Sequence, residues 1–268
     1  MNPAFHWLCW RRDISNFAML KYRDFDAYLI TMQHAGTHWL KFMMSTAIAH
    51  QYGLEPPQFI HNASSNDFIG HPKHPRIHTQ TPRIASSHSI PHAWFDSRLV
   101  RSLIKFPPNV VLLRDLRAAL VSNFEKWKDK YACDFSEYLR GDLKGKRFNF
   151  DLWTGMHFYN RWGRVQQRFP NSIYVTTYER LGADPRCEIE RIFRHLKIDI
   201  DESHIEPAIH LGSKTNMSTM LDPDEPVKNI VRQNDADPRT WFDQQDRSFF
   251  DATIATQLKN SFGYEFDW

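Results

Sequence analysis

The amino-acid sequence predicts an α/β fold in which a parallel sheet is covered by helices on both faces. Three times along the chain, a short apolar run typical of a buried strand precedes a segment with apolar residues at helical spacing. Repeated strand-then-helix units indicate parallel strands joined by crossover helices. The chain has 268 residues and shows neither an internal repeat nor a dividing linker, so we expect a single domain, 1–268.

The first strand-and-helix unit spans residues 27–50. Its apolar run, Ala-Tyr-Leu-Ile-Thr-Met at 27–32, ends at the turn Gln-His-Ala-Gly at 33–36. A helix is expected from Thr37 to His50, because the apolar residues there recur on one broad face. These residues are Trp39, Leu40, Met43, Met44, Ala47 and Ile48.

The second and third units follow the same order. Residues 109–113 predict a strand before a helix at 116–127, and residues 172–177 predict a strand before a helix that begins near Arg186. Asp184 and Pro185 suit the N-cap and first turn of that last helix. Its buried face is expected to comprise Ile189, Ile192, Phe193 and Leu196.

The remaining segments predict a further strand, a C-terminal helix and two long loops. Residues 82–87 favour a strand, and apolar residues at helical spacing between 249 and 258 indicate the helix. Residues 51–81 and 201–239 contain several prolines. Long irregular segments in a compact α/β protein often act as lids or binding loops, and we expect lids here.

The composition excludes several classes of protein. Hydrophobic residues make up 41% and charged residues 24% of the chain, with only 10 Gly and 15 Pro, so we expect a globular protein. The formal net charge of +3 is too small for a general nucleic-acid binder. No nucleic-acid partner is therefore expected, and any anion site must be local.

The cysteines and the hydropathy pattern favour a cytoplasmic protein. Cys9, Cys133 and Cys187 are too few and too scattered for a disulfide framework, which indicates a reducing compartment. No run of about 18 apolar residues is present, so we expect no membrane span. The first residues carry their charges after a very short apolar stretch, unlike a secretory signal.

Two further features leave alternatives open. The aromatic content of 14% predicts a wide apolar pocket, although an aromatic core would account for it equally well. His71, His74 and His78 are close enough in sequence to bind a transition metal, but Pro72 and Pro75 prevent a helix that would align them. We expect no metal site there.

The turn after the first strand is a candidate anion site. A buried strand would deliver a short turn containing Gly36 onto the first amides of a helix, whose dipole favours negative charge, and Thr37 adds a hydroxyl. The segment is not a Walker A loop, because it has one glycine and no lysine before Thr37. On this feature alone, an ordinary strand-to-helix turn is the alternative.

Two segments in this order resemble the sulfotransferase family. Residues 31–40 are similar to the family's 5′-phosphosulfate-binding loop, T-Y-P-K-S-G-T-T-W-L. The matching residues are Gly36, Thr37, Trp39 and Leu40. Arg114, with Ser122 eight positions later, resembles the 3′-phosphate-binding segment R-[ND]-P-x-D-x-x-x-S. An arginine at a strand end offers a planar fork to such a phosphate.

Later segments extend the resemblance over most of the chain, from residue 27 to about 242. Residues 82–91 resemble the family's P-R-x-x-K-[ST]-H-L-P segment, which puts His88 at the position of the catalytic base. Residues 174–189 resemble the run whose tyrosine, here Tyr178, packs near the adenine. Shorter similarities put Met217 over the nucleotide base and Arg232 on the 3′-phosphate.

The resemblance implies a P-loop-NTPase-like sheet and a sulfotransferase activity. The donor would be 3′-phosphoadenosine 5′-phosphosulfate (PAPS), which leaves as adenosine 3′,5′-bisphosphate (PAP), and no metal would be needed. His88 would act as the general base in an in-line displacement, and His34 would share the catalytic role. The residues implied to bind the donor are His34, Ala35, Gly36, Thr37, His38, Trp39, Arg114, Ser122, Tyr178, Met217 and Arg232.

The chain departs from the family pattern at charged positions. His34 replaces the loop lysine, Ser86 replaces a second lysine, and Leu116 and Ala118 replace a proline and an aspartate. A lost donor to developing charge typically costs about 3 to 4 kcal/mol unless another group substitutes. A protonated His34 is the expected substitute, because a neighbouring dianion favours imidazolium, and Lys41 is the poorer candidate.

Neither the acceptor nor the oligomeric state follows from the sequence. Aromatic walls suit the hydroxyl or amine of a small molecule, a lipid or a carbohydrate alike. The dimerisation motif of some family members, K-x-x-x-T-V-x-x-x-E, is absent. Two alternative functions stay open: a catalytically silent binding module, suggested by the missing lysines, and a P-loop kinase, which would need a loop lysine and a carboxylate for Mg²⁺.

Overall fold

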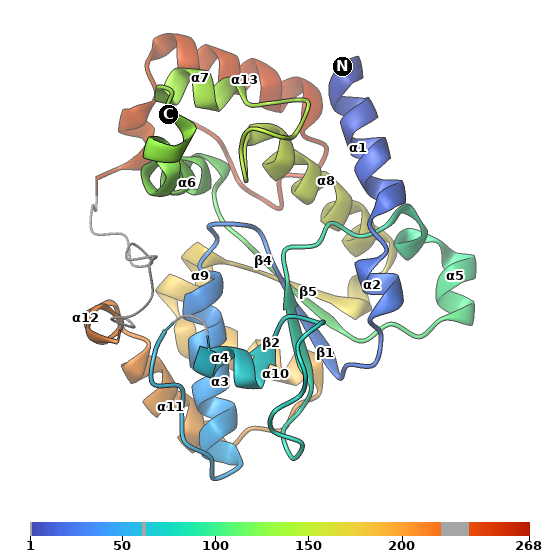
Figure 1. Ribbon diagram of the computed structural model, residues 1–268, viewed down its shortest axis with the longest axis vertical. Helices are drawn as coiled ribbons and strands as arrows, with labels where there is room; N and C mark the ends of the chain where they lie inside the picture. Colours follow the sequence, from blue (N-terminus) through green and yellow to red (C-terminus); the bar gives the residue numbers. More distant parts are fainter. Residues whose placement is uncertain (1, 61–62, 221–235) are drawn as a thin grey trace.

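The computed structural model describes residues 2–60, 63–220 and 236–268 (Figure 1). Its sheet has five parallel strands in the order β2-β3-β1-β4-β5. The strands are β1 (Ala27–Thr31), β2 (Ile69–Gly70), β3 (Ile84–Ser87), β4 (Asn109–Leu113) and β5 (Ile173–Thr177). The parallel sheet expected from the repeated units is confirmed.

The register of the sheet aligns the carboxyl ends of its central strands. Ile30 pairs with Ser87, Thr31 pairs with Leu112, and Leu113 pairs with Thr177. The residues that follow β1, β3, β4 and β5 therefore emerge along the same edge. In open α/β sheets, this edge is where ligands bind.

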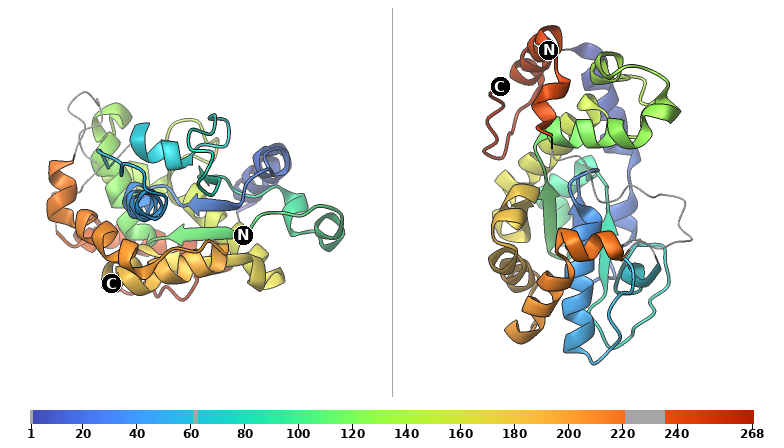
Figure 2. Two further views of the ribbon diagram at one scale, coloured as in Figure 1. Left: turned by 90° about the horizontal axis from the view of Figure 1, so that it is seen from below. Right: turned by 90° about the vertical axis from the view of Figure 1, so that its left-hand side faces the viewer.

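Helices cover both faces of the sheet. The helix α3 (Thr37–Gln51) lies on one face and α10 (Pro185–Leu196) lies on the other (Figure 2). Residues 40–49 of α3 are all buried rather than one face alone, because α11 (Glu202–Leu211) packs along its other side. The expected start of α10 is confirmed: the Asp184 carboxylate accepts a hydrogen bond from the Cys187 amide, and Pro185 is the first helical residue.

A helical lobe stands above the carboxyl edge of the sheet (Figure 1). It consists of α6 (Leu116–Tyr131), α7 (Phe135–Arg140), α8 (Leu152–Arg168) and α13 (Gln244–Gln257). One hydrophobic cluster extends without a break from the strands into these helices. The lobe therefore covers the edge at which the strands end.

The remaining helices and the 3₁₀ turns lie around the sheet and the helical lobe. The helices are α1 (Pro3–Ser15), α2 (Ala18–Lys21), α4 (Ala63–Phe68), α5 (Arg98–Leu103), α9 (Tyr178–Ala183) and α12 (Lys214–Thr219), with 3₁₀ turns η1 (Ala93–Asp96), η2 (Pro170–Ser172) and η3 (Pro238–Trp241). Among the described residues, none of the helices is long and apolar enough to cross a membrane.

The prediction of two long irregular loops, at residues 51–81 and 201–239, is partly wrong. The segment 51–81 contains α4 and β2, and the segment 201–239 contains α11 and α12. Pro207 lies inside α11, where burial of Ile205 and Ala208 outweighs the lost amide hydrogen bond. Residues 221–235, which include Arg232, lie outside the described residues.

Candidate active site

The turn between β1 and α3 requires glycine at position 36. His34 and Gly36 both have positive φ angles, 61° and 89°. A Cβ atom added to Gly36 would lie 2.6 Å from Cδ2 of Tyr178, so no larger residue fits without displacing that ring. Gly36 is the N-cap residue of α3, and the first amides of the helix lie at this turn. This geometry suits an anion.

His88 follows β3 and is held by the end of β1. Its Nδ1 atom lies 2.8 Å from the backbone oxygen of Thr31. A carbonyl oxygen can only accept, so Nδ1 carries the proton and Nε2 keeps its lone pair. Burial lowers the pKa of His88, and the charge of Lys41 lowers it further, against the effect of the Thr31 bond. Solvent still reaches the residue from the open side, so the lowered pKa reflects the protein atoms packed around the ring rather than complete enclosure.

Two threonine hydroxyls connect His88 to the turn. The Thr31 Oγ1 atom lies 3.0 Å from His88 Nδ1 and 2.8 Å from the Oγ1 atom of Thr37. Thr37 is the first residue of α3. His88 and the turn are therefore joined by one short chain of contacts.

Arg114 follows β4 and lies directly on the turn. Its NH1 group donates to the backbone oxygen of His34 at 3.1 Å, and its guanidinium carbon lies 4.3 Å from the centre of the Tyr178 ring. The Tyr159 hydroxyl donates to the Arg114 carbonyl oxygen at 2.6 Å and fixes the backbone there. The two segments singled out by the resemblance are thus in contact.

An aromatic and apolar wall continues from Tyr178. The rings of Trp39 and Tyr178 meet edge to face with centroids 5.4 Å apart, and Trp39 Nε1 donates to the Gly212 carbonyl oxygen at 2.7 Å. Trp39 also packs against a small cluster that contains Met217 and Phe42. Tyr178 and Met217, which are distant in sequence, are therefore linked through Trp39.

Burial governs the pKa of His34, the residue that the sequence predicts to be protonated when a dianion is bound beside it. Burial lowers its pKa to about 3, and the charges of Lys126, His88 and Arg114 lower it further, although a hydrogen bond with the Asn123 side chain opposes them. The imidazole is therefore neutral at pH 7 in this arrangement. It lies 6.2 Å from the Phe150 ring, under the helical lobe.

Sequence reasoning missed Lys126. This residue lies on α6 one helical turn after Ser122, so both occupy the same side of the helix. Its side chain is half-buried, and burial lowers its pKa. The charge of Lys126 lowers the pKa of His34, and the Lys126 Nζ atom lies 5.6 Å from the centre of the Trp127 ring. The spacing of four from Ser122 was the signal available in the sequence.

Lys41 also lies beside the site. It is buried on α3, and its ammonium group donates to the Asn66 side-chain oxygen. Burial lowers the pKa of Lys41 to about 8. Its charge lowers the pKa of His88, so it affects the base rather than the turn.

The structure does not bring the three loop histidines together. The rings of His71 and His74 lie 5.6 Å apart, but His78 stacks on Phe68 with centroids 4.6 Å apart. Within the described parts of the chain, no group of three or more His, Cys, Asp or Glu side chains could hold a metal ion.

Two further residues that the sequence predicts to bind the donor lie on the helices beside the turn. Ser122 is half-buried on α6, and His38 lies in the first turn of α3.

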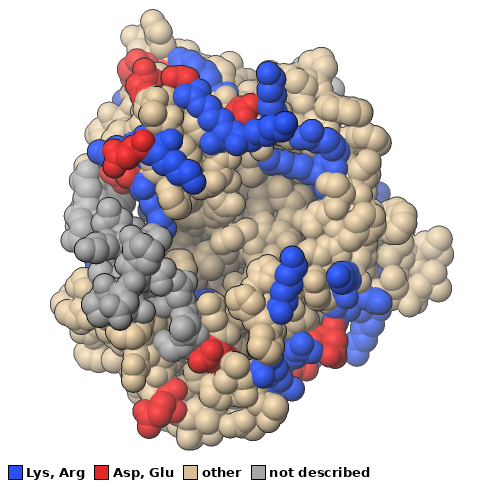
Figure 3. Space-filling view, viewed as in Figure 1, with Lys and Arg blue, Asp and Glu red and all other residues tan. Residues whose placement is uncertain are grey.

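The carboxyl edge of the sheet opens into a hollow. Figure 3 shows this hollow at the centre of the face, between the strands and the helical lobe, with Lys and Arg side chains along its upper rim. A strand-to-helix turn, a histidine of fixed tautomer and an arginine converge at this edge. Such a site can hold an anionic group and accept a proton.

Comparison with known proteins identifies the family. The model of the sulfotransferase domain matches residues 24–265. The chain belongs to the sulfotransferase family. The match covers the turn, His88, Arg114 and Tyr178 together, so the resemblance seen in the sequence is confirmed.

A curated relative and two solved structures are similar to the chain. Cytosolic sulfotransferase 13 of Arabidopsis thaliana is 26% identical over 197 residues, which are 70% of this chain and 58% of the relative. Mouse sulfotransferase SULT7A1, solved with PAP, has a TM-score of 0.63 at 15% identity, over 91% of this chain and 88% of its own. Retinol dehydratase with retinol and PAP has a TM-score of 0.57 at 16% identity, over 99% and 97%. These sulfotransferase neighbours confirm the P-loop-NTPase-like fold.

Proposed function

We propose that this chain transfers a sulfuryl group from PAPS to an acceptor hydroxyl or amine, and that His88 is the general base. One observation carries the proposal: the Gly36-Thr37 turn, Arg114 and His88 lie together at the carboxyl edge of the sheet. Two neighbours of the same fold were solved with PAP, which is what remains of PAPS after the sulfuryl group has been transferred. Membership of the sulfotransferase family supports the same reaction class.

The residues present fit the donor. The first amides of α3 and the Thr37 hydroxyl suit the 5′ end, and Arg114 with Ser122 would hold the 3′-phosphate. Gly36 lets the backbone approach closely, because a Cβ there would collide with Tyr178. The wall of Tyr178, Trp39 and Met217 would face the adenine.

The positive charge that the loop lacks would come from Lys126. His34 donates one hydrogen bond when its ring is neutral, whereas Lys126 can supply a full positive charge in addition to any that a bound dianion induces on His34. Lys126 approaches from α6, on the helical lobe, and lies near enough to lower the pKa of His34. In sulfuryl transfer, as in phosphoryl transfer, alignment and charge stabilisation supply most of the rate enhancement.

His88 is poised to take the acceptor's proton. The bond from Nδ1 to the Thr31 carbonyl orients the ring and leaves Nε2 as the free base. PAPS supplies the sulfuryl group, and its bond to the leaving phosphate breaks as the acceptor attacks. The acceptor would be a small molecule, a lipid or a carbohydrate that carries a hydroxyl or an amine.

Transfer of radiolabelled sulfate across an acceptor panel tests this function. We expect turnover by the wild type and a loss of at least a hundredfold in His88→Asn, with PAP binding kept. Equal turnover by His88→Asn would remove His88 from the role of base. Nucleotide binding without turnover on any acceptor would favour a silent module, and a preference for ATP with Mg²⁺ over PAP would favour a kinase.

A further inference from the structure

An exposed aromatic pair lies on the outer side of α1. Trp7 and Trp10 are 61% and 52% exposed, and their rings stack with centroids 4.9 Å apart. Exposed stacked tryptophans are unusual in water-soluble proteins, which normally bury most of the surface of such side chains. Ile14, one helical turn further along, continues the same side of the helix.

The apolar surface continues from α1 to α5. Phe17 meets Trp94 edge to face at 6.3 Å, and Leu99 and Leu103 lie four residues apart on α5 with exposures of 70% and 76%. Figures 1 and 2 place α1, α2 and α5 along the same side of the molecule. We define the α1–α5 face by its exposed apolar residues: Trp7, Trp10, Ile14, Phe17, Trp94, Leu99 and Leu103.

The exposed charges of this face are all positive. In residues 3–21 and 93–105, the exposed charged side chains are Arg11, Lys21, Arg98 and Lys105. The two acidic residues of these segments point inward. Asp13 pairs with His157 at 2.7 Å and Arg161 at 3.2 Å, and the buried Asp96 pairs with Arg161 and Arg164.

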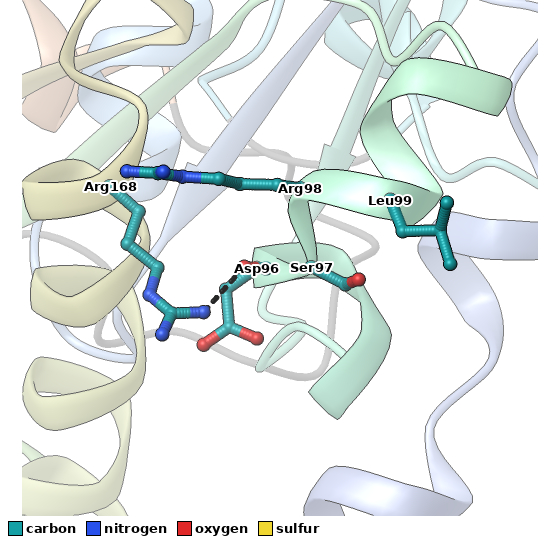
Figure 4. Close-up of a pocket in the computed structure, with 5 residues that line it drawn as sticks. All are labelled: Asp96, Ser97, Arg98, Leu99 and Arg168. Atoms are coloured by element: carbon teal, nitrogen blue, oxygen red, sulfur yellow. Dashed lines mark hydrogen bonds between the residues drawn. The ribbon is translucent and has the colours of Figure 1, made fainter.

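A basic cavity opens at the same face. It has a volume of about 500 Å³ and is lined by Asp96, Ser97, Arg98, Leu99 and Arg168. Figure 4 shows Arg98 extending from the start of α5 toward α8, and Arg168 extending from α8 toward Asp96, whose backbone oxygen it bonds at 2.9 Å. The Asp96 carboxylate is already paired with two arginines, so the cavity favours an anion.

We propose that the α1–α5 face docks on a membrane surface that contains anionic phospholipid, with a lipid phosphate in the cavity between Arg98 and Arg168. Tryptophan and leucine side chains with interspersed Arg and Lys are the pattern that lies in the headgroup region of such a surface. A second copy of the chain fits less well, because a two-fold interface would oppose like charges. The inference does not depend on the proposed sulfuryl transfer.

Sedimentation with lipid vesicles tests the proposal on the full chain. We expect binding to vesicles of phosphatidylcholine with about 30% phosphatidylserine, little binding to phosphatidylcholine alone, and weaker binding at high salt. Trp7→Ser with Trp10→Ser, and separately Leu99→Ser with Leu103→Ser, should each lower the partition coefficient at least tenfold. Arg98→Gln should lower it about fivefold.

Matched controls come from exposed residues outside the face. Ile77→Ser removes an apolar side chain of 54% exposure, and Lys128→Gln removes an exposed charge on α6. Both should bind vesicles like the wild type. Equal binding by the wild type and the double variants of α1 and α5 would overturn the proposal. So would a concentration-dependent dimer, seen by sedimentation velocity, that the Trp7 and Trp10 substitutions abolish.

Discussion

At the scale of single residues, the close approach of Tyr178 to Gly36 predicts an effect of backbone geometry on PAP affinity. Gly36→Ala adds a methyl group 2.6 Å from the Tyr178 ring at a position with φ of 89°. We expect the Tyr178 ring and Arg114 to shift, so that PAP affinity measured by calorimetry falls at least tenfold. The strain of a left-handed alanine alone costs about 1 kcal/mol of stability.

Gly53 provides the matched control for this substitution. Its φ is +62°, but a Cβ atom there meets nothing within 4 Å. Gly53→Ala should therefore lose similar stability while it keeps PAP affinity. If both variants bind PAP equally well, the close approach of Tyr178 to the turn is irrelevant to the ligand.

The protonation of His88 predicts the acid limb of the pH profile. Its pKa lies below the ordinary value of 6.5, so the neutral base persists as the pH falls through 6.5. The acid limb of kcat/KM should therefore lie below pH 6.5. Lys41→Met removes a neighbouring positive charge, so it should move the limb upward, toward 6.5. A limb above pH 6.5 in the wild type, or a downward shift in the variant, would contradict this account.

At the scale of elements, α6 carries the proposed charge toward the turn. Lys126→Met should lower kcat/KM about tenfold to a hundredfold, because one positive donor to the developing charge is lost. Lys126→Arg should recover part of this loss. Lys130→Met, at an exposed position on the same helix, is the control and should remain near the wild type. If Lys126→Met keeps full activity, the missing loop lysine has another substitute.

The elements also show which structural signals are local. The units at 27–50, 109–127 and 172–196 were predictable, because apolar run length, helical spacing and the Asp184-Pro185 cap are short-range signals. The helix α11 was not predictable from the sequence, because Pro207 locally signals a helix break. Packing against α3 stabilises the helix nevertheless. Burial on all sides of α3 likewise depends on a partner more than 150 residues away.

At the scale of the whole molecule, the parallel topology explains how much of the site could be predicted. The resemblance to sulfotransferases grouped His88, Arg114 and Tyr178 in the sequence, and the parallel strands explain why they meet, because the residues after β1, β3, β4 and β5 share one edge. The pKa of His34 could not be predicted from the sequence, because it depends on how the helical lobe buries the ring at that edge. Lys126 was missed for the same reason.

We propose that two separate sites hold the two phosphate ends of PAP: the Gly36-Thr37 turn at the 5′ end, and Arg114 with Ser122 at the 3′ end. Calorimetry with PAP and with adenosine 5′-phosphate distinguishes the two sites. We expect Ser122→Ala to lower the affinity for PAP at least tenfold and to change the affinity for adenosine 5′-phosphate less than threefold, because that ligand lacks the 3′-phosphate. Arg114→Gln should lower the affinity for PAP more than the affinity for adenosine 5′-phosphate, although Arg114 also contacts the turn and the Tyr178 ring. A wild type that binds both ligands equally, or variants that weaken both equally, would contradict the claim.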